Sequence, residues 1–195
     1  MEDIISLPIK KHDKLGLIMK RIVDQCHIDQ NKYYVLGSYP LREHRSINDM
    51  DVIMFKNEFD KLQKCAPYGK IETYNNQIRW FYDMTDTYRK LVDPEAKDFS
   101  IEIYRKEMDE GYPNKDFSLA SLLQNKRLQR DMFGHQHLTL EALLEGKKIT
   151  NRPKDQADIE LLIKLLGKKD MSAGYYHKYM KYRNKYYDLK SRFQF

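Results

Sequence analysis

Hydrophobic positions in the first third of the chain follow a helical period and then a strand pattern. Within residues 13–28, apolar side chains recur every three or four positions, which predicts an amphipathic helix. The positions are Leu15, Ile18, Met19, Ile22, Val23 and Cys26. Residues 33–36 and 49–55 are rich in aliphatic and aromatic side chains and are predicted to be strands. A short helix is expected at 56–65.

Three further segments extend the predicted sheet. They are residues 71–74, 77–82 and 99–104. The first two are expected to form a hairpin, because Asn75-Asn76 between them suits a tight turn. The third alternates apolar and polar residues, which places Glu102 on the polar face of its strand. Residues 84–97 are interpreted as a loop.

After Gly111 the pattern becomes helical. Helices are predicted at about 117–132, 137–145, 153–167 and 172–191. Pro153 suits the first position of the third helix, and Gly167 suits its end. The order of elements predicts an α+β fold, in which a small mixed β-sheet is flanked by helices and followed by a helical C-terminal half.

The same pattern predicts three regions. Residues 1–110 would form the core that carries the sheet, and residues 111–170 a helical subdomain packed on it. Residues 171–195 would form a basic, tyrosine-rich helix.

Composition is that of an ordinary globular protein. Of 195 residues, 41% are hydrophobic and 33% are charged. No apolar run approaches the roughly 20 residues of a membrane helix, and the N-terminal sequence does not resemble a signal peptide. The two cysteines, Cys26 and Cys65, suggest neither a disulfide framework nor a metal site, so a reducing, cytoplasmic compartment is expected.

Positive charge is concentrated at the C-terminus. From Lys164 onward, nine basic and two acidic residues give a charge of +7, which leaves −1 for the rest of a chain whose net charge is +6. The first 163 residues therefore do not have the charge of a general nucleic-acid binder.

An aromatic stripe runs along the last predicted helix with alternating spacings of four and three. Its members are Tyr175, Tyr179, Tyr182, Tyr186, Leu189 and Phe193. The stripe is interpreted as a surface that docks on the same chain or on a second copy as a homodimer, in preference to a nucleic-acid patch. The tyrosine- and lysine-rich string resembles tails of proteins from giant, mimivirus-like DNA viruses, which implies a viral origin and a location in the host cytoplasm.

The candidate chemistry lies in the predicted strands. Asp49 and Asp51, two positions apart on one strand, point to the same face. Two adjacent carboxylates repel each other, and a hard divalent cation such as Mg²⁺ is the usual compensation. Glu102 would join them if its strand lies beside theirs, although it also reads as an ordinary exposed strand acid. The pair itself also occurs by chance at strand starts.

A turn precedes the two aspartates by ten residues. Gly37 allows a sharp bend and a close approach to a ligand, and the Ser38 hydroxyl with nearby N–H groups can cradle phosphates. Arg42 and Arg45 lie in the intervening loop, where they would either neutralise phosphate or remain solvated. His135 and His137 are interpreted as a loop or cap, without the ligands of a metal site.

Together these residues resemble the signature of the DNA polymerase β-like nucleotidyltransferase superfamily, and the short chain resembles its minimal members. The motif consists of Gly-Ser, a spacer, Asp-x-Asp in an apolar strand and one later acid. The resemblance implies that Asp49, Asp51 and Glu102 bind Mg²⁺ or Mn²⁺ as the catalytic set. It implies that Gly37 and Ser38 hold the nucleoside triphosphate. Residues 151–159 resemble a helix start of small members, which implies a nucleotide-binding role for Lys154, although Lys154 also suits a helix N-terminus.

The sequence therefore predicts an enzyme that transfers a nucleoside monophosphate, such as that of ATP, to a hydroxyl acceptor and releases pyrophosphate. The acceptor is left open among a small molecule, a protein and an RNA end. Two alternatives stand beside it. One is a non-catalytic, antitoxin-like module that binds a nucleotide or a partner, and the other is an RNA-binding accessory protein that uses the basic tail.

Overall fold

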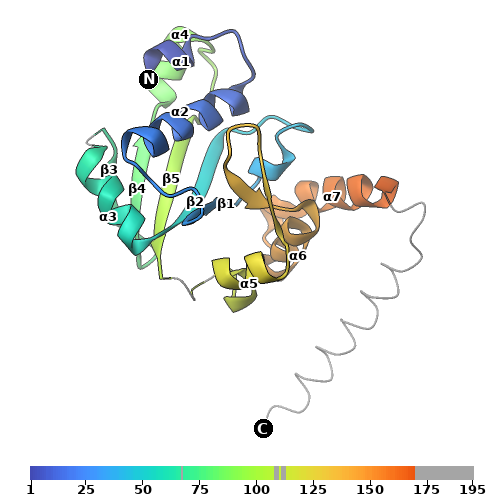
Figure 1. Cartoon of the computed structure of the whole chain (residues 1–195). Coiled ribbons are helices and arrows are strands. Elements are labelled where there is room, and N and C mark those ends of the chain that lie inside the picture. Colours follow the sequence, from blue (N-terminus) through green and yellow to red (C-terminus); the bar gives the residue numbers. More distant parts are fainter. Residues whose placement is uncertain (67, 108–109, 111–112, 170–195) are drawn as a thin grey trace. The chain divides into compact units, whose positions relative to one another are not determined.

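A computed structural model describes the chain except residues 67, 108–109, 111–112 and 170–195 (Figure 1). Its described residues form two compact units, and the division falls between Arg152 and Pro153. The predicted C-terminal helix at 172–191 and its aromatic stripe lie outside the described residues.

A mixed sheet organises the first unit. Within the described residues it has seven strands in the order β3-β4-β5-β2-β1-β7-β6. The strands are β1 (Tyr33–Val35), β2 (Asp49–Phe55), β3 (Lys70–Tyr74), β4 (Gln77–Asp83), β5 (Ser100–Lys106), β6 (Leu128–Arg130) and β7 (Gln136–Leu138). Neighbours β2 and β5 run parallel, as do β1 and β7, and the other pairs are antiparallel.

Helices of the first unit are interspersed among the strands. They are α1 (Glu2–Ile5), α2 (Lys11–Gln25), α3 (Lys56–Cys65), α4 (Thr85–Leu91), α5 (Leu119–Gln124) and α6 (Leu140–Thr150), with short 3-10 turns η1 (Tyr39–Leu41) and η2 (Lys115–Phe117). The second unit contains the turn η3 (Pro153–Asp155) and helix α7 (Gln156–Lys169). The α+β class predicted from the sequence is confirmed.

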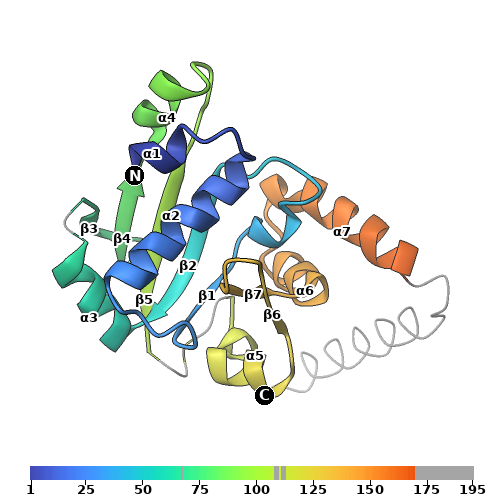
Figure 2. The same ribbon diagram turned by 45° about the horizontal axis from the view of Figure 1, so that its top comes forward.

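One face of the sheet forms the main hydrophobic core. Helices α2 and α3 pack on β2 and β5 there, as Figure 2 shows for α2. Met50 and Val52 of β2 lie opposite Ile101 and Ile103 of β5 in this core. Because side chains alternate along a strand, Asp51 and Glu102 point to the opposite face. The apolar face thus anchors the strands that carry the predicted acidic residues.

Most predicted strands are confirmed. The strand at 49–55 is correct to the residue, and the hairpin turn at Asn75-Asn76 has positive φ angles of 49° and 60°, as its sequence suggested. Residues 84–97 were expected to be a loop, but they contain α4, whose first N–H is accepted by the Asp83 carboxylate at 2.9 Å. The helix predicted at 153–167 continues beyond Gly167 to Lys169.

The predicted helix at 117–132 is wrong in its second half. Helix α5 ends at Gln124, and Lys126 adopts a φ of 53°, which a helix does not allow. The chain then forms the short hairpin of β6 and β7, with Gly134 at a φ of 86° in the connection. Strand β7 pairs with β1, so this segment belongs to the same sheet as the earlier strands.

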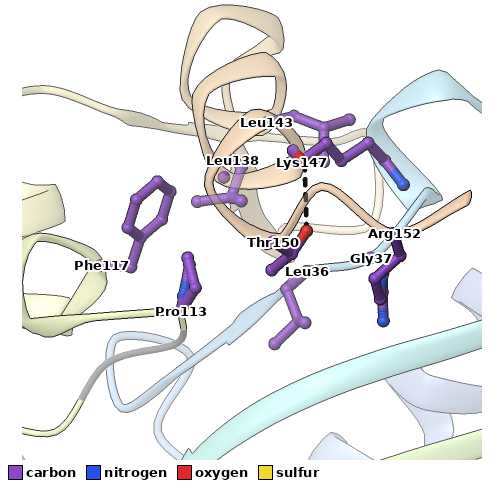
Figure 3. A pocket seen from close by; sticks show the side chains of 10 residues that line it. Leu36, Gly37, Pro113, Phe117, Leu138, Leu143, Lys147, Thr150 and Arg152 are labelled. Carbon is purple, nitrogen blue, oxygen red and sulfur yellow. Dashed lines mark hydrogen bonds between the residues drawn. The ribbon is translucent and has the colours of Figure 1, made fainter. Parts of the chain in front are cut away.

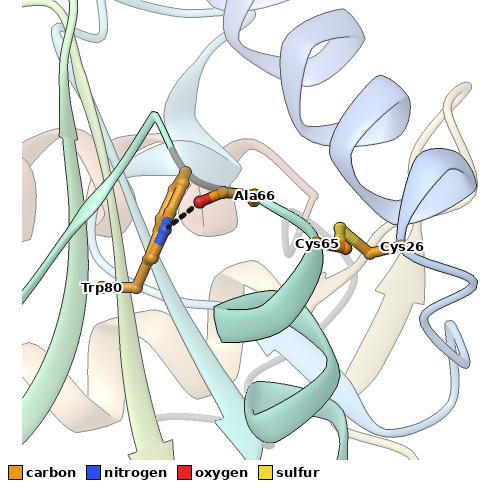
Figure 4. The surroundings of a disulfide bond; sticks show 4 residues. All are labelled: Cys26, Cys65, Ala66 and Trp80. Carbon is orange, nitrogen blue, oxygen red and sulfur yellow. Dashed lines mark hydrogen bonds between the residues drawn. A yellow bond between two sulfur atoms is a disulfide. The ribbon is translucent and has the colours of Figure 1, made fainter.

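Cys26 and Cys65 form a disulfide, contrary to the expectation from sequence (Figure 4). Cys26 follows α2 directly and Cys65 ends α3. Both helices pack on the sheet, and the Cα atoms of the two cysteines lie 5.6 Å apart. Their separation of 39 residues gave no local sign of this pairing. The expectation of a reducing compartment rested on unpaired cysteines, so the structure no longer supports that argument. The localisation remains a prediction.

Throughout the described part of the chain, no helix is both long enough and apolar enough to cross a membrane.

Candidate functional site

The parallel pairing of β2 and β5 brings the predicted acidic residues together. Asp51 lies directly opposite Glu102, and Asp49 lies opposite Ser100. Neighbouring strands are about 4.8 Å apart, so carboxylates at paired positions on one face are within reach of a common ligand. The sequence analysis left open whether the Glu102 strand lies beside the aspartate strand. The structure confirms that the two strands are neighbours.

Gly37 lies against Asp51. A Cβ atom at Gly37 would stand 2.5 Å from Asp51 Oδ2, and the residue has a φ of +66°, which side chains rarely adopt. The preceding N–H, of Leu36, donates to the Asp51 carbonyl at 2.9 Å. Glycine suits this turn better than any residue with a side chain, and the Leu36 hydrogen bond joins the turn to the acidic strand.

Lys147 of α6 approaches the other residue of the turn. Its Nζ donates to Ser38 Oγ at 3.3 Å, although the lysine is only 5% exposed. Sequence reasoning missed Lys147 and chose Lys154 instead. The sequence did contain a signal for Lys147, because this lysine lies on the apolar face of its helix. A charge is costly to bury without a partner, so such a lysine is expected to have one.

A small cavity opens beside the turn (Figure 3). Its volume is about 40 Å³, and it is lined by Leu36, Gly37, Pro113, Phe117, Leu138, Leu143, Gly146, Lys147, Thr150 and Arg152. Figure 3 shows the Arg152 side chain beside Gly37. Pockets that enclose a drug-sized ligand have about 300 Å³ or more, so this cavity is large enough only for a small group. Two of the lining side chains, Lys147 and Arg152, are cationic, while most of the lining is apolar.

Glu102 makes strong contacts of its own. Its Oε2 accepts a hydrogen bond from the Tyr104 hydroxyl at 2.5 Å and is paired with the Arg79 guanidinium. Burial, followed by the hydrogen bond to Glu102, raises the pKa of Tyr104, so the phenol keeps its proton and acts as the donor. The carboxylate is thus engaged by two partners on one oxygen.

The other predicted phosphate ligands have different surroundings. Arg42 lies over the Tyr39 ring at 4.7 Å, and its Nη1 is 3.3 Å from His137 Nε2. Arg45 is exposed and donates to the Ser46 carbonyl at 2.9 Å. Lys154 is exposed in η3 of the second unit. The phosphate-binding roles of these three residues remain predictions.

His135 and His137 are buried, and His137 lies within β7 itself. His135 Nδ1 is 2.7 Å from the Tyr33 hydroxyl, and its Nε2 is 2.9 Å from the Gly16 carbonyl. Burial lowers the pKa of His137 to about 4. Both imidazoles are therefore neutral parts of the interior, where sequence analysis expected a loop or cap.

The donor chemistry of Asp49 and Asp51 fits a hard divalent cation, because both offer carboxylate oxygens on one strand face. Among the residues that the structure describes, no three His, Cys, Asp or Glu side chains are grouped so as to hold a metal ion. The Glu102 carboxylate, which lies opposite Asp51, is paired with Arg79 through its Oε2 atom. The residues that fit a divalent cation are thus Asp49 and Asp51.

Comparison with known proteins gives no independent assignment. No family model, no curated protein and no solved structure matches this chain.

Proposed function

We propose that the protein is a metal-dependent nucleotidyltransferase of the DNA polymerase β-like type. It would transfer a nucleoside monophosphate from a triphosphate to a hydroxyl acceptor and release pyrophosphate. The observation that carries this proposal is the contact between Gly37 and Asp51. It joins a turn suited to phosphate with a strand suited to a divalent cation, which are the two elements that nucleotidyl transfer requires.

The residues around the contact between Gly37 and Asp51 have separate roles in this proposal. Asp49 and Asp51 would hold Mg²⁺ or Mn²⁺, which neutralises the phosphates and orients them for in-line displacement. Gly37 lets the backbone approach the phosphates, and Ser38 offers its hydroxyl. Lys147 supplies a positive charge from α6 beside Ser38. Positioning and charge stabilisation account for the catalysis, without a covalent intermediate on the protein.

The small cavity beside Gly37 limits how a nucleotide would bind. About 40 Å³ is too little to enclose a nucleoside. We therefore assign the Gly37-Ser38 turn, with Lys147 beside it, to the phosphates and leave the sugar and base outside the cavity.

The test is pyrophosphate release from each of the four triphosphates, labelled at the α-phosphate, with Mg²⁺ and a cell lysate as the source of acceptors. We expect release by the wild type and none by the Asp49→Ala/Asp51→Ala double variant. Asp86→Ala is the matched control, because the Asp86 side chain is fully exposed on α4. The labelled product would identify the acceptor class.

The opposite result would favour the non-catalytic alternative. If neither wild type nor double variant released pyrophosphate while both bound triphosphate or a protein partner equally well, the enzyme proposal would be rejected. The fold would then be a binding module.

A further inference from the structure

The third acidic residue of the site is bound by an arginine of the neighbouring strand. Arg79 of β4 pairs with Glu102 Oε2, the same oxygen that accepts the Tyr104 hydroxyl. The two side chains lie on one sheet face, since Arg79 is in register with Tyr104 two residues beyond Glu102. The Arg79 and Glu102 side chains are only 12% and 19% exposed, so water screens the ion pair weakly.

Arg79 is held firmly in this position. Its Nε donates to Glu72 of β3 at 2.7 Å. Its guanidinium lies 4.1 Å from the centre of the Tyr74 ring and 4.8 Å from that of Phe81. An arginine stacked on two rings and paired with two carboxylates has little freedom to move away. Its charge is therefore a fixed part of the site.

We infer that Arg79 is a positioning residue that keeps Glu102 out of the metal's ligand set, so that the site binds a single divalent cation on Asp49 and Asp51. This inference rests on the proposed function. A carboxylate already neutralised by a guanidinium attracts a second cation weakly, and the two cations would also repel each other at close range. The sequence resemblance implied the opposite role for Glu102.

Metal stoichiometry tests the inference directly. Mn²⁺ is titrated into the full chain in the presence of a non-hydrolysable triphosphate analogue, and bound Mn²⁺ is counted from the electron paramagnetic resonance signal of the free ion. We expect one Mn²⁺ per chain in the wild type. Arg79→Met, which keeps the aliphatic stem but removes the guanidinium, should bind a second Mn²⁺ because Glu102 is released. Arg79→Lys should restore a single ion.

Two further variants make the assignment specific. Arg79→Met/Glu102→Gln should return to one ion, because the second ion would depend on Glu102. Arg105→Met is the matched control, since Arg105 lies on the opposite face of β5 and should leave the count at one. Two ions in the wild type, or one in every variant, would overturn the inference while leaving the proposed function intact. No Mn²⁺ in the wild type would instead contradict the proposed function itself.

A single substitution covers the case in which Arg79→Met does not fold. Glu102→Gln keeps the shape of the side chain and an acceptor for Tyr104. If Glu102 is not a ligand, the Mn²⁺ dissociation constant should change by less than about threefold. If Glu102 is a ligand, loss of its charge should weaken Mn²⁺ binding by about tenfold or more, which would overturn the inference.

Discussion

Gly37 and Asp51 are in direct contact, with Asp51 Oδ2 only 2.5 Å from where a Cβ atom of residue 37 would stand. The turn before η1 therefore packs directly against the acidic strand β2. A side chain at position 37 would have to displace the Asp51 carboxylate.

Gly37→Ala tests this arrangement. The positive φ of +66° should cost about 1–2 kcal/mol in the free energy of unfolding, and the added methyl group must displace the Asp51 carboxylate. We expect pyrophosphate release to fall by about 100-fold, because a shift of 1 Å in a catalytic group has an effect of that size. Chemical denaturation and the transfer assay measure the two effects.

Gly167→Ala provides the control for that substitution. Gly167 lies in α7, and a Cβ atom there would meet nothing within 4 Å. Alanine should raise the free energy of unfolding by about 0.5–1 kcal/mol, because it is the better helix former, and should leave activity unchanged. Equal loss of activity in both variants would contradict the role assigned to the turn.

Lys147→Met tests the cation that the sequence did not reveal. A charged hydrogen bond contributes about 1.5–3 kcal/mol, so the KM for the triphosphate should rise by about tenfold or more. The free energy of unfolding should fall little, because methionine fills the same buried space. Lys148→Met is the control, since Lys148 is exposed on the same helix. An unchanged KM would remove Lys147 from the phosphate site.

The outcome for particular residues shows what sequence patterns can predict. Strand β2 was predicted to the residue, because a run of apolar residues after Asp51 is a local signal. The two most informative side-chain contacts were not predicted. Arg79 and Glu102 are 23 residues apart, and Lys147 and Ser38 are 109 apart, so both contacts depend on how distant elements pack.

Short elements escaped prediction for a different reason. Strands β6 and β7 have three residues each, which is too few for an alternating pattern to appear. Their existence depends on the pairing of β7 with β1, a tertiary contact. The Cys26–Cys65 disulfide likewise depends on tertiary structure, because it joins the ends of α2 and α3, which both pack on the sheet.

The disulfide should stabilise the fold measurably. It closes a loop with a sequence separation of 39, for which the chain-entropy argument gives about 4 kcal/mol in the free energy of unfolding. Thermal unfolding with and without reductant should therefore show a lower midpoint for the reduced wild type. The Cys26→Ser/Cys65→Ser variant should melt at the lower temperature under both conditions. A midpoint insensitive to reductant in the wild type would contradict a disulfide in solution.

Buried His137 should make the fold sensitive to acid. Burial lowers its pKa to about 4 in the folded protein, from an ordinary value near 6.5. Between these values the unfolded chain binds more protons, so the histidine's contribution to stability is complete above about pH 6.5 and is lost as the pH falls toward 4. The shift corresponds to about 3 kcal/mol in the free energy of unfolding.

Denaturant titrations at several pH values isolate this effect when the wild type is compared with His137→Gln. The variant keeps an acceptor for Arg42 but cannot gain a proton, so its stability should fall less between pH 6.5 and pH 4. His44→Gln, at an exposed position, should follow the wild type throughout. Parallel curves for wild type and His137→Gln would show that His137 is protonated as readily in the folded state as in the unfolded one, which its burial in β7 argues against.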